Sequence, residues 1–121
     1  MPRPPRGEGS YPPQRRAFGL ARVAGESMRP TLAPGDRLLV RYGAEVRDGR
    51  LVLARFADGT LVVKRASGRR PSRSGEPAWW LVSDNTDEGV DSRHRGPVPA
   101  RDVVAVVVAR AWPRPALGRR L

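Results

Sequence analysis

The sequence contains no cysteine, one histidine and one lysine. Without cysteine, neither a disulfide nor a thiolate metal site can form, and the redox compartment is left open. The single histidine, His94, cannot build a histidine-based metal cluster. The acidic residues between Asp84 and Asp91 lack the spacing of a calcium-binding EF-hand loop. We therefore expect no metal and no cofactor.

Long apolar runs are also missing. The longest run, Val103 to Ala109, has seven residues, whereas a membrane-spanning helix needs about 20. Arg22 interrupts the first apolar segment, so no stretch of signal-peptide length occurs near the N-terminus. From these absences we expect a soluble, cytoplasmic protein without an integral membrane segment. Peripheral attachment to a membrane stays open.

Positive charge is abundant, and nearly all of it is arginine. The formal net charge is +11, and 22 of the 23 basic residues are Arg. Such a charge is found in nucleic-acid-binding proteins. However, the basic residues are spread along the chain, and charge alone supports only non-specific binding. We expect no specific nucleic-acid partner. A non-enzymatic basic β module that binds nucleic acid is the rival hypothesis from another functional class.

The length of 121 residues predicts a single domain. Residues 1–16 hold five prolines and four arginines, a composition typical of a disordered tail. Residues 17–113 form the expected core, with a flexible stretch at 67–77, and residues 114–121 form a basic C-terminal tail. The oligomeric state is left open.

Short β-type runs fill the core. Ala57-Asp58-Gly59 separates two of them and indicates a hairpin, because Gly and Asp tolerate the positive φ of such turns. We predict a small all-β fold, partly closed like a barrel, with at most one helical turn at 30–32. The expected strands are 18–24, 37–42, 51–56, 60–65, 79–83 and 102–112.

Two residues could carry chemistry. Ser27 lies between a strand and a turn fixed by Pro30, where its hydroxyl can stand at a sheet edge and its backbone N–H can stabilise an oxyanion. On this segment alone, an ordinary strand-to-turn serine is the better interpretation. Lys64, the only lysine, follows three apolar residues, and a desolvated lysine can lose the proton that arginine keeps. Its strand would place it on the face of Val62, and Arg65, if close in space, would lower its pKa further.

Together, three segments resemble the signal peptidase I family of Ser-Lys proteases, in the order in which that family has them. Residues 25–36, Gly-Glu-Ser-Met-Arg-Pro-Thr-Leu and then Gly35-Asp36, resemble its nucleophile segment. Val63-Lys64-Arg65 with Gly68 resembles its lysine segment. The third segment is similar in Asp84-Asn85, Asp91-Ser92-Arg93, Gly96 and Val98-Pro99, and Trp112-Pro113 resembles the usual end of the core.

The resemblance implies a serine endopeptidase with a β-rich core, in which Ser27 is the nucleophile and Lys64 the general base. It implies an oxyanion site at Ser27 and Gly25, and a protein precursor bound as an extended strand. Met28 and Pro30, which flank the nucleophile, are the expected substrate contacts. The residues expected to support the site are Asp84, Asn85, Asp91, Ser92 and Arg93. Among them, Asp91 and Arg93 are expected to form an ion pair.

Three positions depart from the family pattern. Gly25 lies where some members have a hydroxyl that donates to the oxyanion, and Gly89 lies where members often have a serine that orients the lysine. Ser83 replaces a usual glycine. The two glycines remove side-chain hydrogen bonds, so we expect backbone groups or water to replace them and the enzyme to be slow.

The chain resembles one subgroup in particular. Only 20 residues separate Lys64 from Asp84, which is the compact layout of proteases that mature nickel-type superoxide dismutase by removing a short N-terminal propeptide. Residues 91–99 are similar to that subgroup as well. Signal-peptide processing is the alternative. The related self-cleaving repressors form a third possibility, but residues 1–16 are too short for their DNA-binding domain.

Overall fold

The computed structural model describes residues 17–121, which form one antiparallel sheet of eight strands. All six expected strands are present, and the prediction of a small, partly closed all-β fold is confirmed. The expected helical turn at 30–32 is an irregular turn instead. The strands are β1 (Phe18–Arg22), β2 (Arg37–Tyr42), β3 (Leu51–Arg55), β4 (Leu61–Arg69), β5 (Ala78–Val82), β6 (Val98–Pro99), β7 (Val103–Trp112) and β8 (Ala116–Leu117). The helices, none of them expected, are α1 (Ser92–Arg95), η2 (Ala100–Asp102) and η3 (Gly118–Arg120).

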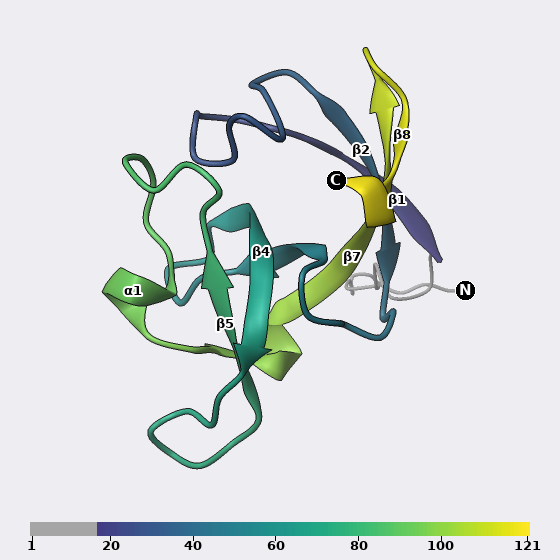
Figure 1. Cartoon of the computed structure of the whole chain (residues 1–121). Coiled ribbons are helices and arrows are strands. Elements are labelled where there is room, and N and C mark those ends of the chain that lie inside the picture. The colour runs from purple at the N-terminus through teal and green to yellow at the C-terminus, as the bar shows by residue number, and fades with distance from the viewer. Residues whose placement is uncertain (1–16) are drawn as a thin grey trace, which may run out of the picture.

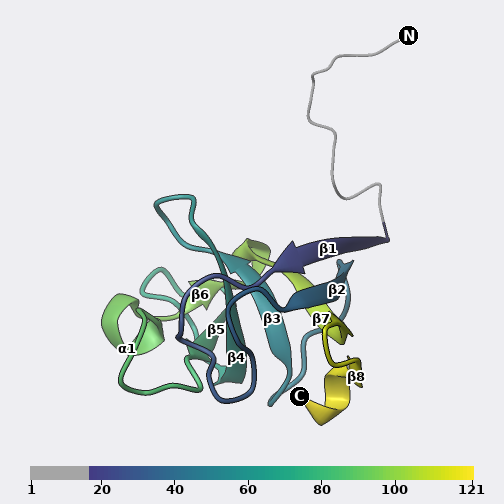
Figure 2. The ribbon, with the colours of Figure 1, turned by 90° about the horizontal axis from the view of Figure 1, so that it is seen from above.

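The sheet curls into a half-barrel (Figure 1). Its strand order is β1-β2-β7-β3-β4-β5-β6, with β8 paired to β7. The register shifts within the pairs β2–β7, β3–β7 and β4–β5. Such irregularities bend strands and increase their twist. They therefore explain how one sheet turns its β1–β2 end toward β4, as the view from above shows (Figure 2).

Two apolar clusters pack on opposite faces of the sheet, because they take alternate residues of β3 and β7. One lies under β1, β2 and β7 and includes Leu38 and Val107, and the other lies under β3, β4 and β5 and includes Val52 and Leu81. Valine, leucine and alanine dominate both clusters, because the sequence offers few aromatic residues. Since β-branched side chains pack well on pleated strands, this composition suits a sheet.

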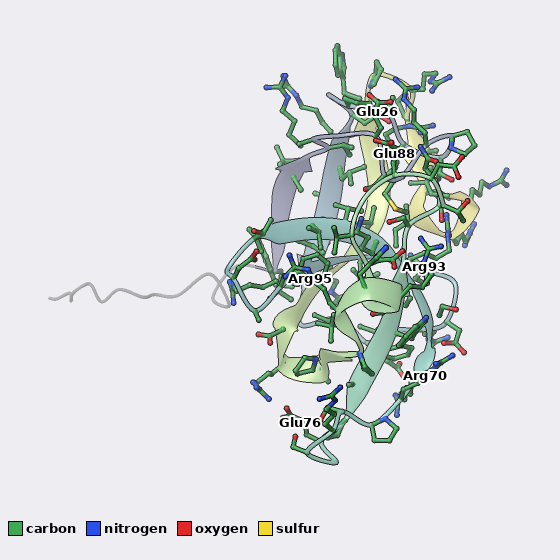
Figure 3. All side chains as sticks on the ribbon, turned by 90° about the vertical axis from the view of Figure 1, so that its left-hand side faces the viewer. Glu26, Arg70, Glu76, Glu88, Arg93 and Arg95 are labelled. Atoms are coloured by element: carbon green, nitrogen blue, oxygen red, sulfur yellow. The ribbon has the colours of Figure 1, made fainter. Side chains whose placement is uncertain are left out.

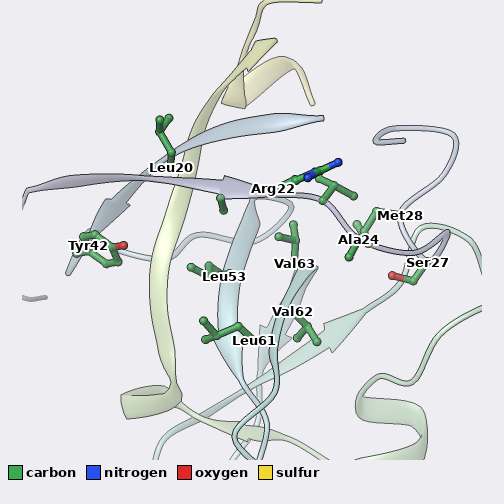
Figure 4. Close-up of a pocket in the computed structure, with 12 residues that line it drawn as sticks. Leu20, Arg22, Ala24, Ser27, Met28, Tyr42, Leu53, Leu61, Val62 and Val63 are labelled. Atoms are coloured by element: carbon green, nitrogen blue, oxygen red, sulfur yellow. The ribbon is translucent and has the colours of Figure 1, made fainter. Parts of the chain in front are cut away.

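Two strand edges are left unpaired and face each other. β1 is the terminal strand of the sheet, and within the described residues Leu61 to Lys64 of β4 pair only with β3. A cavity of about 300 Å³ lies between these edges and is lined by both, as Figure 4 shows. The half-barrel therefore opens along a cleft that has backbone hydrogen-bonding groups on both sides.

Two segments differ from the sequence-based expectation. The stretch at 67–77 was expected to be flexible, yet β4 continues to Arg69 and pairs there with Trp79 of β5. Residues 114–121, expected as a tail, include β8 and η3, and Leu121 packs against the first cluster. In both segments, pairing with a neighbouring strand overrides the polar composition. The expected tail at 1–16 lies outside the described residues.

Replacing Leu81 by alanine tests the second cluster. Leu81 is fully buried in β5, so Leu81→Ala should lower the free energy of unfolding by about 2–5 kcal/mol. The measurement is urea denaturation followed by circular dichroism. Leu20→Ala is the control, because Leu20 lies in β1 but is largely exposed, and its loss should stay within about 0.5 kcal/mol. Equal losses in the two variants would contradict this description of the core.

Candidate active site

Ser27 lies in the turn that joins β1 to β2. The turn is closed at its base, where the backbone N–H of Val23 donates to the carbonyl of Asp36 at 2.9 Å. Inside the turn, the N–H of Leu32 donates to the carbonyl of Met28 at 2.9 Å, and both side chains are buried. The buried side chains of Met28 and Leu32 fix the turn. Ser27, which precedes Met28, stays partly accessible.

The structure brings Lys64 to Ser27. Lys64 lies in β4 and is only 2% exposed. Its Nζ donates to Ser27 Oγ at 3.0 Å and to Ser83 Oγ at 2.9 Å. Ser83 is the first residue after β5 and is buried as well. The amine is therefore held between two hydroxyl groups that come from different parts of the chain.

Burial lowers the pKa of Lys64 below its ordinary value. A desolvated ammonium is unfavourable, so the neutral amine gains population. The carboxylate of Asp91 opposes this shift and the guanidinium of Arg93 adds to it, with burial the dominant cause. The sequence analysis named Arg65 as the nearby cation, but Arg65 pairs with Asp84 instead.

Asp84 links the loop after β5 to β4 and to the turn that carries Ser27. Arg65 Nη2 and Nε donate to its two carboxylate oxygens at 2.6 and 2.8 Å, and the hydroxyl of Thr31 donates at 2.6 Å. Burial alone would raise the pKa of Asp84, but the hydrogen bonds from Arg65 and Thr31 outweigh it, so the pKa lies below its ordinary value. The carboxylate thus stays charged and holds three segments together.

Asn85 binds the backbone carbonyls of Ser27 and of the residue before it. Its N–H donates to the carbonyl of Ser27 at 2.9 Å, and its side-chain amide donates to the carbonyl of Glu26 at 3.1 Å. Within the described residues, the backbone N–H of Ser27 itself has no partner. This N–H lies in the same peptide plane as the Glu26 carbonyl, so the hydrogen bond from the Asn85 side chain fixes its orientation. Gly25 stands two residues before it with φ near +78°, a conformation that glycine adopts without strain.

Asp91 supports the other end of the loop. It is fully buried, caps α1, and accepts hydrogen bonds from the backbone N–H of Ser83 at 2.8 Å and from Arg93 Nη2 at 2.9 Å. Burial would raise the pKa of Asp91, yet these bonds and the Arg93 charge hold it well below the usual range. The expected ion pair of Asp91 with Arg93 is therefore present. Next to it, the buried hydroxyl of Ser92 accepts from the N–H of Leu81 at 2.8 Å.

Cavities lie on both sides of Ser27. The first, between β1 and β4, is lined mainly by apolar side chains, Met28 among them (Figure 4). The second, of about 390 Å³, includes Ser27 and Lys64, and Figure 3 labels Glu26, Glu88 and Arg95 from its rim. Pro30, expected to contact substrate, is exposed and lines neither cavity. A chain segment lying along the cleft would therefore pass Ser27 Oγ.

Gly89 packs the loop after β5 closely against Ser27 and Lys64. A Cβ at this position would lie 2.5 Å from Ser27 Cβ and 3.2 Å from Lys64 Nζ, and φ is +82°. Only glycine fits both the space and the backbone conformation. The sequence analysis expected backbone groups or water to serve Lys64 here. The structure places the hydroxyl of Ser83 beside the amine instead.

Sequence reasoning missed the roles of Ser83, Thr31 and Arg65. Ser83 was noted only as a departure from a glycine, although a polar residue that directly follows the apolar strand at 78–82 was a usable signal. Arg65 and Thr31 gave no such signal, because their partner, Asp84, is 19 and 53 residues away. Only the folded sheet brings these pairs together.

Comparison with known proteins assigns the family. The model of the Peptidase S24-like family matches residues 9–95. The chain belongs to this family of peptidases. It is 33% identical over 119 residues to mitochondrial inner membrane protease subunit 1 of Schizosaccharomyces pombe, covering 81% of the chain and 76% of that protein. The subunit of the same name from Xenopus tropicalis is 28% identical over 116 residues, covering 78% and 70%. The proteases that mature nickel-type superoxide dismutase are not singled out by these matches.

The expectation of a cytoplasmic protein is wrong. Both relatives are named as subunits of a mitochondrial inner membrane protease, and this points away from the cytoplasm. The expectation rested on the absence of a long apolar run, which does not determine where a protein works. Among residues 17–121, no helix is long and apolar enough to cross a bilayer.

Replacing Gly89 by alanine tests how tightly the loop packs on the reactive groups. Gly89→Ala should displace Ser27, because its Cβ would overlap that of Ser27, and peptidase activity on reduced casein should fall about 100-fold. Gly59→Ala is the matched control, with a similar φ of +89° but open space around the Cβ. Both variants should lose about 1 kcal/mol of stability from backbone strain. A Gly89→Ala enzyme as active as the control would contradict the packing.

Proposed function

We propose that the chain is a serine endopeptidase in which Ser27 is the nucleophile and Lys64 the general base. The observation that carries this proposal is the 3.0 Å contact between the buried Nζ of Lys64 and Ser27 Oγ, at the cleft between two unpaired strand edges. A nucleophile and a base within hydrogen-bonding distance are what covalent acyl transfer needs. Membership of a peptidase family argues against the rival, a non-enzymatic nucleic-acid-binding module.

The reaction follows from the protonation states of the dyad. The neutral amine of Lys64 takes the proton of Ser27 as Oγ attacks the scissile carbonyl. The resulting ammonium returns that proton to the leaving amine, and an acyl-enzyme forms on Ser27. Lys64, neutral again, then removes a proton from a water molecule as that water attacks the ester. The resulting ammonium gives the proton to Ser27 Oγ as the ester bond breaks, so the acid product leaves and both residues return to their starting states. Arginine could not take part, because its guanidinium keeps its proton.

The negative charge that develops on the carbonyl oxygen needs a fixed donor. The N–H of Ser27, without a partner among the described residues and oriented by Asn85, supplies one. Gly25 carries no side chain that could add a second donor. An oxyanion site with so few donors supports the expectation of a slow enzyme.

The substrate is proposed to bind as an extended strand between β1 and β4. Both edges present unpaired backbone groups, and extended peptides bind to such edges through main-chain hydrogen bonds. The adjoining cavity of about 300 Å³, lined by side chains such as Val63 and Leu53, favours an apolar substrate side chain next to the scissile bond. The binding mode thus fits a flexible segment of a precursor rather than a folded domain.

The proposed physiological reaction is limited cleavage of a precursor protein. Signal-peptide processing has some support from the relatives, which are named as membrane protease subunits. Removal of the propeptide of a nickel-type superoxide dismutase rests on the resemblance of residues 91–99 and on the compact layout alone. Incubation with each kind of precursor, followed by mass spectrometry of the products, distinguishes the two substrates.

Ser27→Ala should abolish proteolysis and leave the fold intact, because the lost hydroxyl is the nucleophile and contributes little to packing. Cleavage of a precursor is measured by mass spectrometry and folding by circular dichroism. The control is Ser72→Ala, which removes an exposed hydroxyl far along the chain and should leave cleavage unchanged. Cleavage by Ser27→Ala at the wild-type rate would overturn the assignment of the nucleophile.

Lys64→Arg should be nearly inactive although it keeps the positive charge, because a guanidinium cannot accept the Ser27 proton. Wild-type kcat/KM should rise with pH as Lys64 deprotonates, and the rise should begin below the ordinary lysine pKa of about 10.4. The measurement is the pH–rate profile of both proteins. An active Lys64→Arg enzyme would place the base elsewhere.

Lys64→Met separates loss of chemistry from loss of folding. Methionine fills the buried site without a charge, so this variant should fold yet be inactive. In wild type, the unfolded chain holds the Lys64 proton to higher pH than the folded protein does, so this group makes stability increase with pH up to about pH 10.4. Denaturation at several pH values should show that this increase is absent from Lys64→Met.

A further inference from the structure

Lys64 touches two serines, and only one of them can meet a substrate. Ser27 Oγ is 3.0 Å and Ser83 Oγ 2.9 Å from Nζ. Ser27 lines both cavities, whereas Ser83 lines neither and is 4% exposed. Ser83 therefore cannot attack a peptide bond in the cleft, and its contact with the amine needs another explanation.

A hydroxyl beside the amine controls the direction of its lone pair. Neutral Lys64 has two N–H groups and one lone pair on Nζ. When Ser83 Oγ accepts one N–H, rotation about the Cε–Nζ bond is restricted, and the lone pair can be held toward Ser27. After Lys64 has taken the proton, the same oxygen still accepts from the ammonium. Ser83 can thus act in both protonation states without giving up a proton.

The backbone that carries this hydroxyl is held in place by a charged pair. The backbone N–H of Ser83 donates to Asp91 at 2.8 Å, and Asp91 is bound by Arg93. The carboxylate is fully buried, so moving it would leave a charge without partners. The Asp91–Arg93 ion pair therefore fixes the backbone of Ser83, and the Ser83 hydroxyl contacts the Lys64 amine.

The opposite wall leaves room for one such hydroxyl only. A Cβ on Gly89 would lie 3.2 Å from both Lys64 Nζ and Ser83 Oγ. A side chain there would compete with Ser83 for the same place beside the amine. The pairing of a serine at 83 with a glycine at 89 is therefore a matched arrangement.

We propose that Ser83 is a positioning residue that aims the Lys64 amine at Ser27. This role rests on the proposed Ser27–Lys64 mechanism and acts through Lys64 alone. Other charged groups also surround the amine. They are Asp91 and Arg93, together with Glu26, Glu88 and Arg95 on the rim of the second cavity. Substituting Ser83 changes none of these charges.

The test is the pH profile of kcat/KM for p-nitrophenyl acetate, followed at the isosbestic wavelength of p-nitrophenol, with the rate of Ser27→Ala subtracted. In Ser83→Ala the plateau at high pH should fall about 10- to 100-fold, because the amine is no longer aimed. The rising limb should also move to lower pH, because a buried ammonium that loses an acceptor is less stable. Ser83→Thr, which keeps the hydroxyl, should restore the limb to its wild-type position.

Ser92→Ala is the matched control. It removes a buried hydroxyl that lies in α1 between Asp91 and Arg93 and accepts from the N–H of Leu81 rather than touching Lys64. Its rising limb should stay where wild type has it, even if the protein is less stable by urea denaturation. A Ser83→Ala profile with the wild-type plateau and limb, or one changed only as Ser92→Ala is changed, overturns the positioning role.

The same assay separates this role from the mechanism beneath it. If Lys64→Met keeps wild-type activity above the Ser27→Ala background, the Ser27–Lys64 mechanism itself fails, whatever Ser83→Ala does. If Lys64→Met is inactive while Ser83→Ala matches wild type, the mechanism stands and the role of Ser83 alone is rejected.

Discussion

Burial of the Lys64 amine is the constraint on which the site depends. Removing the amine from water favours its neutral form, which is the form that can accept a proton. The same burial makes each hydrogen bond to the amine contribute to stability, because burying a polar group without a partner raises the free energy of the folded protein. Ser27, in the turn after β1, and Ser83, after the end of β5, each place a hydroxyl beside Nζ. One buried atom thereby fixes how two distant segments approach β4.

Arginine has a different part in this structure. Arg65 and Arg93 each bind a buried or partly buried carboxylate with more than one nitrogen. Their planar, permanently charged groups suit such pairs. Both pairs lie at the two ends of the loop 84–91, so they fix its position over the dyad. Rigid support thus comes from arginine, and in the proposed mechanism proton transfer falls to the single lysine.

Local patterns revealed much of the fold. Runs of valine and leucine separated by turn residues predicted β1 to β5 and β7 but not the two-residue strands β6 and β8, and the hairpin at Ala57–Gly59 formed as expected. Ser27 and Lys64 were found because each stood out in its own segment. Their 3.0 Å contact follows from sheet closure, which depends on register shifts that no local pattern encodes. The pairing of β8 with β7 and the contact of Thr31 with Asp84 were missed for the same reason, since their partners are far apart in sequence.

The two unpaired edges of the cleft also have a consequence for the protein in solution. An exposed edge accepts any extended chain, including the edge of a second copy, and such pairing begins many aggregates. The formal charge of +11 opposes it, because copies of the protein repel one another at a distance. At 0.1 M salt that repulsion is largely screened beyond about 10 Å, so it acts mainly at low ionic strength or short range. The arginine-rich composition therefore has an electrostatic consequence beyond its ion pairs: its net charge disfavours pairing of the open strand edge with a second copy.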